Sequence, residues 1–346
     1  TNLSTPPGQS CASCHSPETG FSGPDSTINA THAAYPGAMQ GRFGNRKPPT
    51  AAYAGESPVL NFDDLQLAWI GGMFWNGRAS GWTLGDPLAE QALRPSLNPL
   101  EQNLTDAEEV VAKVQQSDYA GLFKEVWGTV DWGNETQRIF EYIGRSIAAY
   151  ERSSEVNPFS SKYDYYLAGK AELTEQEASG LALFNGTARC ASCHISQPGP
   201  NGEPPLFTNF TYDNLGAPKN PMNPFYSLPS EFNPDGGNWV DLGLGGFLEE
   251  QGLDYEWETG KHKAPTLRNA DLRPDPAFVK AYLHNGVLKS LEELVHFYNT
   301  RNSEPWDPPE VGENMNLEDV GDLQLTQEEE AAIVAFLKTL SDGYKP

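Results

Sequence analysis

Hydrophobic positions along this chain recur every three to four residues in several segments, which is the spacing of one face of an α-helix. In the segment 134–153, Ile139, Ile143 and Ile147 form one apolar stripe, so we expect a helix that packs against a core. Capping boxes, in which a hydroxyl and a carboxylate three residues later satisfy free backbone N–H groups, mark further helix starts. They are Thr105/Glu108, Thr174/Glu177, Ser290/Glu293 and Thr326/Glu329. Because strand-like alternation is scarce, the pattern predicts an all-α fold.

Two segments interrupt the helical pattern. The polar, tyrosine-rich stretch 154–172 is typical of a connection, which predicts an N-terminal domain 1–160 and a C-terminal domain 161–346. The segment 195–260 is rich in Gly, Pro and Asn, and we expect it to be mainly irregular loop. The fold is therefore expected to be helical, with long irregular loops.

Composition narrows the class of protein. A length of 346 residues fits two domains, and a hydrophobic fraction of 38% is enough for packed cores. The net charge of −24 argues against nucleic-acid binding and would attract a basic protein partner. No apolar run approaches the roughly 20 residues that cross a bilayer, and no signal peptide is present. We expect a soluble, already processed protein.

The four cysteines carry the clearest chemical signal. They fall in two copies of one pentapeptide, Cys11-Ala12-Ser13-Cys14-His15 and Cys190-Ala191-Ser192-Cys193-His194. Cys-x-x-Cys-His is the attachment signature of c-type haem, because two thiols add to the vinyl groups of one porphyrin and the next residue presents an imidazole to the iron. The sequence predicts two covalently bound haems in two cytochrome c-like halves, with axial ligands His15 and His194. Such attachment normally happens outside the cytoplasm, so a periplasmic or cell-surface location is expected.

Three other uses of these cysteines compete with haem attachment. A zinc site with four thiolates would need closer spacing between the two pairs. A thioredoxin-like Cys-x-x-Cys needs a βαβ context, which surrounds neither pair. Two disulfides would leave the repeated adjacent histidine unexplained.

The second axial positions have few candidate ligands. Electron-transfer cytochromes fill this position with Met or His, and a catalytic haem leaves it open. In the helix that begins at Ser290, Tyr298 shares one face with Leu291 and Val295, whereas His296 should face solvent. From spacing alone, Tyr298 is either a core tyrosine or an iron ligand. The other candidates are Met39, Met73, Met222, Met315, His32, His262 and His284.

Three further runs accompany the haem motifs. They are Phe74-Trp75-Asn76-Gly77-Arg78-Ala79, Ala264-Pro265-Thr266-Leu267-Arg268-Asn269, and His284-Asn285-Gly286 followed by Leu291-Glu292-Glu293. With these runs in this order, nearly the whole chain resembles the bacterial di-haem cytochrome c peroxidase and MauG family. The resemblance implies a high-spin peroxidatic haem on His15 and a six-coordinate, low-spin haem on His194 and Tyr298. Tyr at the last position is the MauG-like pattern, whereas ordinary peroxidases of this family carry Met.

The same resemblance implies a peroxide site. Gln91, Pro95 and Glu101 match the family's residues on the open side of the peroxidatic haem, although the stretch between Trp75 and Gln91 is several residues longer here. A glutamate there can move a proton between the two peroxide oxygens. Trp75 matches the family's tryptophan that carries charge between the two irons.

A calcium ion is also implied, between the domains, held by an Asn side chain and two backbone carbonyls. The carbonyl positions map to Val279 and Ala281. The Asn normally lies in an Arg-Asn-x-Pro run, but here the run is Asn45-Arg46-Lys47-Pro48-Pro49. Lys47 therefore falls at the ligand position, and Asn45 would need a shifted register.

Other residues are assigned weaker roles. His32 lies where classical peroxidases carry a histidine that caps the iron, but its neighbours differ, and we expect an exposed loop histidine. His284 is expected to hydrogen-bond near the second haem without binding iron, and His262 and His296 have no assigned role. The surface tryptophans Trp239 and Trp257 are candidate exit points for oxidising equivalents, or ordinary packing residues.

The resemblance implies an enzyme in which H₂O₂ oxidises the first haem, charge spreads through Trp75 into a bis-Fe(IV)-type state, and a Trp or Tyr of a partner protein is oxidised. One alternative is a classical cytochrome c peroxidase, which takes electrons from a small cytochrome or cupredoxin. A second alternative is a non-enzymatic di-haem electron carrier in which both irons are six-coordinate.

Overall fold

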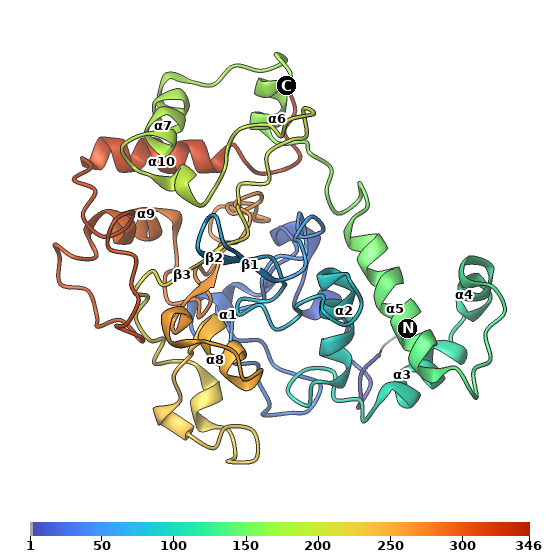
Figure 1. Cartoon of the computed structure of the whole chain (residues 1–346). Helices are drawn as coiled ribbons and strands as arrows, with labels where there is room; N and C mark the ends of the chain where they lie inside the picture. The colour runs from blue at the N-terminus through green and yellow to red at the C-terminus, as the bar shows by residue number, and fades with distance from the viewer. Residues whose placement is uncertain (1–2) are drawn as a thin grey trace.

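The computed structural model describes residues 3–346, and most of its regular structure is helical (Figure 1). The α-helices of this part of the chain are α1 (Ser26–Ala30), α2 (Pro87–Leu97), α3 (Ala107–Gln115), α4 (Ala120–Trp127), α5 (Thr136–Glu151), α6 (Lys162–Leu167), α7 (Glu175–Asn185), α8 (Gly243–Glu250), α9 (Leu291–Thr300) and α10 (Gln327–Lys338). Long irregular segments connect them, as the sequence predicted. Short 3₁₀ turns, among them Cys11–Ser13 and Cys190–Ser192, form part of these segments.

The expectation of an all-α fold is wrong in one detail, because two small antiparallel sheets are present. Strands β1 (Asn61–Asp63) and β2 (Ala68–Ile70) form one sheet, and β3 (Tyr212–Asp213) and β4 (His262–Lys263) form the other. Strands of two or three residues are too short for a period-two pattern to appear in the sequence. The β1–β2 hairpin is instead set by Asp63, whose carboxylate accepts the backbone N–H groups of Leu65 and Gln66.

The predicted helix starts are confirmed, with one shift. Thr174 and Thr326 form complete capping boxes at α7 and α10. Ser290 caps α9 by accepting the backbone N–H of Glu293. At α3 the cap is Asp106 rather than Thr105, because the Asp106 carboxylate accepts the N–H of Glu109.

Two expected connections contain additional helices. The segment 154–172 holds α6, which begins with a capping box between Ser161 and Asp164 and buries Tyr163. The segment 195–260 contains α8. This helix begins with several glycines, so the sequence pattern predicted a loop there. Both segments are therefore more ordered than predicted.

Two helix groups lie on opposite sides of the loop-rich centre (Figure 1). In the first group α2 and α3 pack on α5, and the expected stripe of Ile139 and Ile143 lies in the core between them. In the second group α7 packs on α10, and aromatic residues of both helices and of α9 fill the core, including Phe184, Phe297 and Phe336. Within the described residues, no helix has both the length and the apolar character needed to span a bilayer.

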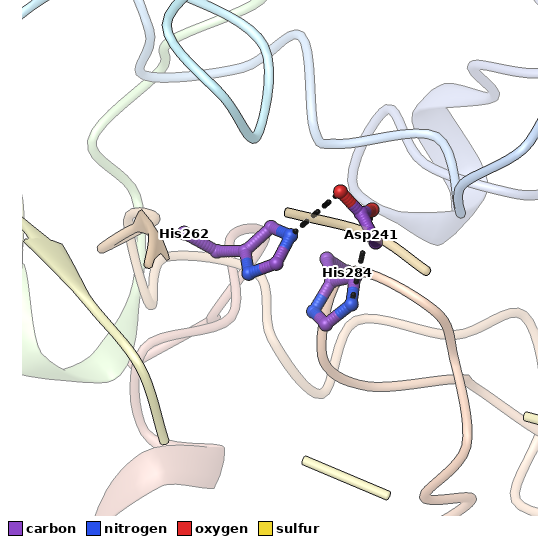
Figure 2. A group of neighbouring side chains, drawn as sticks. All are labelled: Asp241, His262 and His284. Atoms are coloured by element: carbon purple, nitrogen blue, oxygen red, sulfur yellow. Dashed lines mark ion pairs between the residues drawn. The ribbon is translucent and has the colours of Figure 1, made fainter. Parts of the chain in front are cut away.

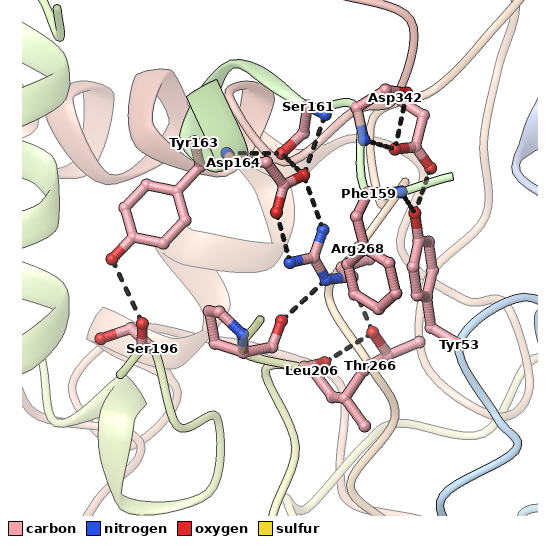
Figure 3. Close-up of polar contacts among 12 residues, drawn as sticks. Tyr53, Phe159, Ser161, Tyr163, Asp164, Ser196, Leu206, Thr266, Arg268 and Asp342 are labelled. Atoms are coloured by element: carbon pink, nitrogen blue, oxygen red, sulfur yellow. Dashed lines mark hydrogen bonds and ion pairs between the residues drawn. The ribbon is translucent and has the colours of Figure 1, made fainter. Parts of the chain in front are cut away.

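A buried cation holds the second group together (Figure 3). The Arg268 guanidinium forms two hydrogen bonds with the Asp164 carboxylate at 3.0 and 2.8 Å and a third with the Pro205 carbonyl at 2.7 Å. It also lies 4.9 Å from the ring centre of Tyr53 and 4.6 Å from that of Phe159, which belong to the preceding half of the chain. Arg268 thus links α6, the loop around residue 205 and the N-terminal part.

Candidate functional site

Each Cys-x-x-Cys-His motif lines its own cavity. The first cavity contains Cys11, Cys14 and His15 in its wall, and the second contains Cys190, Cys193 and His194. They span about 1320 and 1540 Å³, respectively, part of which is open to solvent. Lys47, Thr50 and Trp75 line both cavities, so the two sites meet at these side chains.

The two histidines are held by the same local geometry. The Nδ1 atom of His15 lies 3.0 Å from the carbonyl oxygen of Phe21, and that of His194 lies 2.8 Å from the carbonyl oxygen of Phe207. Both phenylalanines have positive φ angles, 54° and 55°, which aim these carbonyls at the rings. With Nδ1 donating, Nε2 is left as the lone-pair nitrogen, which is the arrangement of a metal-binding histidine. Burial lowers the pKa of both imidazoles and favours the neutral, ligating form.

The cysteines are not used in disulfides or in a common metal site. All four are free thiols. Burial raises the pKa of Cys14 and of Cys190 to about 12, which opposes the thiolate form that zinc requires. Across residues 3–346, the one group of side chains with metal-like spacing contains no cysteine. The thiols therefore fit thioether attachment better than the competing uses.

The wall of the first cavity contains the three predicted peroxide-site residues. Gln91 and Pro95 lie one helical turn apart on α2 and both line the cavity. Glu101 follows α2 and joins them in the wall, where its Oε1 atom accepts a hydrogen bond of 2.8 Å from the Asn98 amide. Burial raises the pKa of Glu101, which suits a group that both takes and returns a proton.

Arg78 is a member of this site to which the sequence assigned no role. Its guanidinium carbon lies 3.6 Å from the ring centre of Phe74, and it lines the first cavity. Burial lowers the pKa of Arg78 to about 9, against the opposing charge of Glu101. The signal was available, because Arg78 closes the Phe-Trp-Asn-Gly-Arg run.

An unpaired cation fits the acidic side chains of haem. Lys263 lines the second cavity, where its ammonium lies 4.5 Å from the ring centre of Phe210, and burial lowers its pKa to about 7. Lys263 has no ion-pair partner in the described chain. A buried cation without a counter-charge is costly, and a haem propionate would supply that charge. The donor set and the cavity walls therefore fit one haem each.

Tyr298 projects from α9 into the second cavity, as the helical spacing predicted. Its hydroxyl has no hydrogen-bond partner among residues 3–346, and burial raises its pKa. None of the four methionines, all of them within this range, lines either cavity. A thioether ligand is thus absent from the described walls, and an unengaged phenol is present.

A second polar cluster lies at the wall of the second cavity (Figure 2). The rings of His262 and His284 stack in parallel, 3.5 Å apart, and both Nε2 atoms face Asp241, at 3.3 and 3.9 Å from its oxygens. Arg46 already forms two hydrogen bonds of 2.6 Å with the same carboxylate. Parallel rings cannot converge their lone pairs on one ion, so this cluster is better described as a clamp between Arg46 and the later loops.

Trp75 is buried between the cavities. Its indole N–H donates a hydrogen bond of 2.8 Å to the carbonyl of Lys47, and the Lys47 ammonium lies 5.8 Å from its ring centre. The backbone N–H of Lys47 in turn donates to the carbonyl of His284 at 2.8 Å. One short segment therefore fixes the tryptophan in the wall shared by both sites.

The residues expected to hold calcium do not form a common site. Asn45 lines only the first cavity, Ala281 lines only the second, and Val279 lines neither. The Val279 carbonyl already accepts a hydrogen bond of 3.1 Å from the amide nitrogen of Asn29. These residues do not fit a calcium ion as placed here.

Several other candidates lie outside both cavities. His32 is half-buried rather than exposed, because its ring packs edge-on against Phe43 with centres 5.7 Å apart. His296 interacts with the carboxylates of Glu304 and Glu330. Trp257 is 73% exposed, and the half-buried Trp239 packs against the aromatic residues Phe225 and Tyr226.

Comparison with known proteins agrees with this geometry. Residues 1–172 match the family model described as di-haem cytochrome c peroxidase. The chain is 33% identical to the methylamine utilization protein MauG of Paracoccus denitrificans, covering 98% of this chain and 85% of that protein. This chain belongs to the di-haem cytochrome c peroxidase and MauG family. It is accordingly a haem-containing peroxidase-type oxidoreductase.

Two further relatives show the breadth of the family. The cytochrome-c peroxidase IdrP1 of Denitromonas iodatirespirans is 27% identical over 96% of this chain and 76% of its own length. A tyrosine-to-methionine variant of the diheme peroxidase BthA from Burkholderia thailandensis superposes with a TM-score of 0.82 at 30% identity, covering 98% of this chain and 83% of that one. Relatives of this chain thus include both MauG and a cytochrome-c peroxidase. The residues that line the two cavities must distinguish between these two functions.

Proposed function

We propose that this protein is a MauG-like di-haem peroxidase, which uses H₂O₂ to oxidise a Trp or Tyr side chain of a partner protein. The reaction takes two electrons and two protons from the partner and converts one H₂O₂ into two H₂O. Bound haem would supply the redox chemistry, and the residues of the first cavity would meet the peroxide. Cys11 and Cys14 would tether the first haem, and Cys190 and Cys193 the second, with each half of the chain, 1–160 and 161–346, holding one.

The proposal depends on which side-chain atoms in the second cavity are available to bind the haem iron. The Tyr298 hydroxyl lines this cavity without a hydrogen-bond partner in the described chain, and no methionine reaches the wall. The Nε2 atoms of His262 and His284 line the same cavity and also lack a hydrogen bond. The competing nitrogens of His262 and His284 face Asp241 instead. A phenolate oxygen favours the higher oxidation states of iron, whereas a thioether favours the ferrous state. Ligation by Tyr298 therefore suits storage of oxidising equivalents better than relay of single electrons.

The first cavity supplies the proton chemistry. Glu101 would accept a proton from the inner oxygen of the peroxide and return it to the outer oxygen, which leaves as water. Arg78 places a positive charge in the same wall, where it stabilises the negative charge that develops as the O–O bond breaks. Gln91 and Pro95 would shape the space for the peroxide and restrict water.

Trp75 would carry charge between the two sites. It is buried, lines both cavities and is fixed by its hydrogen bond to Lys47, so its indole ring keeps one orientation toward each site. Transfer to the partner then occurs from the surface, at a position that neither cavity defines. A periplasmic or cell-surface location follows from the covalent attachment that we propose.

The deciding experiment adds H₂O₂ to the fully oxidised holoprotein without any reductant. The MauG-like proposal expects a fast optical change at both haems and, with a co-purified partner, a loss of two hydrogens or a crosslink by mass spectrometry. Trp75→Phe should keep the reaction of the first haem and lose the change at the second. Reaction only after one haem has been pre-reduced would contradict the proposal.

A classical peroxidase remains the second candidate, because relatives with that name share the fold and the net charge of −24 suits a basic electron donor. It expects rapid turnover with a reduced small cytochrome or cupredoxin. It also expects turnover to survive when Tyr298 is replaced by Met.

A further inference from the structure

The wall between the two cavities contains a lysine where a metal ligand was expected. Lys47 lines both cavities, and its ammonium donates a hydrogen bond of 3.2 Å to the carbonyl of Pro48. No carboxylate pairs with it in the described chain. The ammonium is near enough to His15 for its charge to contribute to the lowered pKa of that imidazole. Burial lowers the pKa of Lys47 to about 8, so its ammonium is still mostly protonated at pH 7 and places positive charge next to both sites.

A second lysine reinforces this charge. Lys280 is buried, and its ammonium donates to three backbone carbonyls, those of Thr19, Asn269 and Leu272, at 3.0, 3.0 and 2.8 Å. A cage of carbonyl oxygens is the kind of environment that a hard cation would take. Burial, together with a smaller contribution from the charge of Lys47, lowers the pKa of Lys280 to about 7.

The backbone carbonyl expected to bind the metal is also engaged. Asn29 donates its amide N–H groups to Val279 at 3.1 Å and to Gly23 at 3.0 Å, and its amide oxygen accepts from the Tyr35 hydroxyl at 3.2 Å. This network satisfies the amide group without an ion. A divalent cation would have to break it and approach two ammonium groups.

We infer that the Lys47 ammonium, supported by Lys280, takes the place of a divalent cation at the junction of the two haem sites, and that Lys47 positions Trp75 there. The protein accordingly functions without calcium. The carbonyl of Lys47 holds the indole N–H, and its ammonium supplies the positive charge beside both irons. This inference rests on the proposed loading with two haems and not on the identity of the protein substrate.

Metal analysis of the holoprotein tests the first part. After dialysis against EGTA and then against excess Ca²⁺, with free ion removed, elemental analysis should find well below one calcium ion per chain in both samples. The EPR spectra and reduction potentials of the two haems should be the same in both. One tightly bound calcium per chain, or spectra that change with EGTA, would overturn the inference while leaving the MauG-like proposal intact.

Substitution tests the second part. Lys47→Met removes a positive charge near both irons, so both reduction potentials should fall, because the oxidised states lose a repulsive neighbour. Lys47→Arg should restore the potentials toward those of the unchanged protein, which a role in packing alone would not predict. Lys170→Met, at an exposed lysine, is the control and should leave them unchanged. Equal potentials in Lys47→Met and in the unchanged protein would contradict the assigned charge.

Discussion

The two cavities are alike around the histidine and unlike in the rest of their walls. In each, a 3₁₀ turn presents two cysteines, and a phenylalanine carbonyl holds the next histidine by its Nδ1 atom. Elsewhere in its wall, the first cavity carries Glu101 and Arg78, whereas the second carries the Tyr298 hydroxyl, which has no hydrogen-bond partner in the described chain. The repeated Cys-x-x-Cys-His geometry can bind a haem in either site. The wall residues that differ between the cavities determine what each haem can do.

This contrast separates attachment from reactivity. An acid–base pair beside an open position favours reaction with peroxide, and a phenol that fills the position excludes it. A substitution of Glu101, Arg78 or Tyr298 should therefore alter the chemistry of one cavity. A change that displaces a histidine should instead remove one haem site altogether.

The largest effect is expected for Glu101→Gln. The amide cannot accept and return a proton, so the rate of reaction with H₂O₂ should fall by roughly 10²–10⁴-fold, as measured by stopped-flow absorbance. Because burial raises the pKa of Glu101, the unchanged enzyme should lose activity as the pH falls through a value above 4.5, and the variant should lack this limb. The exposed Glu108→Gln is the control. A full rate in Glu101→Gln would remove the functional contrast between the cavities.

The second effect concerns the support of the histidine in the second cavity. Arg268→Met leaves the Asp164 carboxylate buried and unpaired, which should lower the free energy of unfolding by about 3–5 kcal/mol in urea titrations. Arg268 also holds the Pro205 carbonyl, two residues before Phe207, so optical changes should begin at the second haem. Arg138→Met breaks an exposed pair with Glu135 and should leave the free energy of unfolding nearly unchanged. Simultaneous loss of both haem signals would show that the cavities are not supported independently.

Particular residues show how far the sequence predicted this arrangement. The paired Cys-x-x-Cys-His motifs, the capped helices and the inward face of α9 are local patterns, and these predictions match the structure. Arg78 and the Asn29 network depend on side chains brought together from distant parts of the chain, and the short strands carry no periodicity. Lys47 was visible as a departure from the family pattern, but its position between the cavities required the fold.

A third prediction exchanges the ligand type of the second cavity. Tyr298→Met should raise the reduction potential of that haem and stabilise its ferrous form, as redox titration would show, whereas Tyr298→Phe should leave the iron with an open position. Resonance Raman spectra of the unchanged protein should contain phenolate bands that both variants lack. If neither the bands nor the potential depend on residue 298, then His262 or His284 is the ligand.

The smallest effect concerns a carboxylate of the first cavity that has no ion-pair partner in the described chain. Glu151 ends α5 in the wall of the first cavity, and burial raises its pKa to about 7. The folded state thus binds this proton more tightly than the unfolded chain, so the stabilisation is complete below pH 4.5 and is lost as the pH rises through 7. Glu151→Gln should be more stable than the unchanged holoprotein by about 2 kcal/mol at pH 8, and this advantage should shrink toward pH 5.

The measurement is urea unfolding of both holoproteins at the two pH values, with the exposed Glu172→Gln as the control, which should show no such dependence. An advantage that is equal at pH 5 and pH 8 would mean that Glu151 is ionised throughout and has a counter-charge in the loaded cavity. In that case Glu151 would resemble Lys263 of the second cavity, a buried charged group for which we expect the haem to supply the counter-charge. A pH-dependent advantage would instead show that Glu151 stays without a counter-charge and keeps its raised pKa in the loaded cavity.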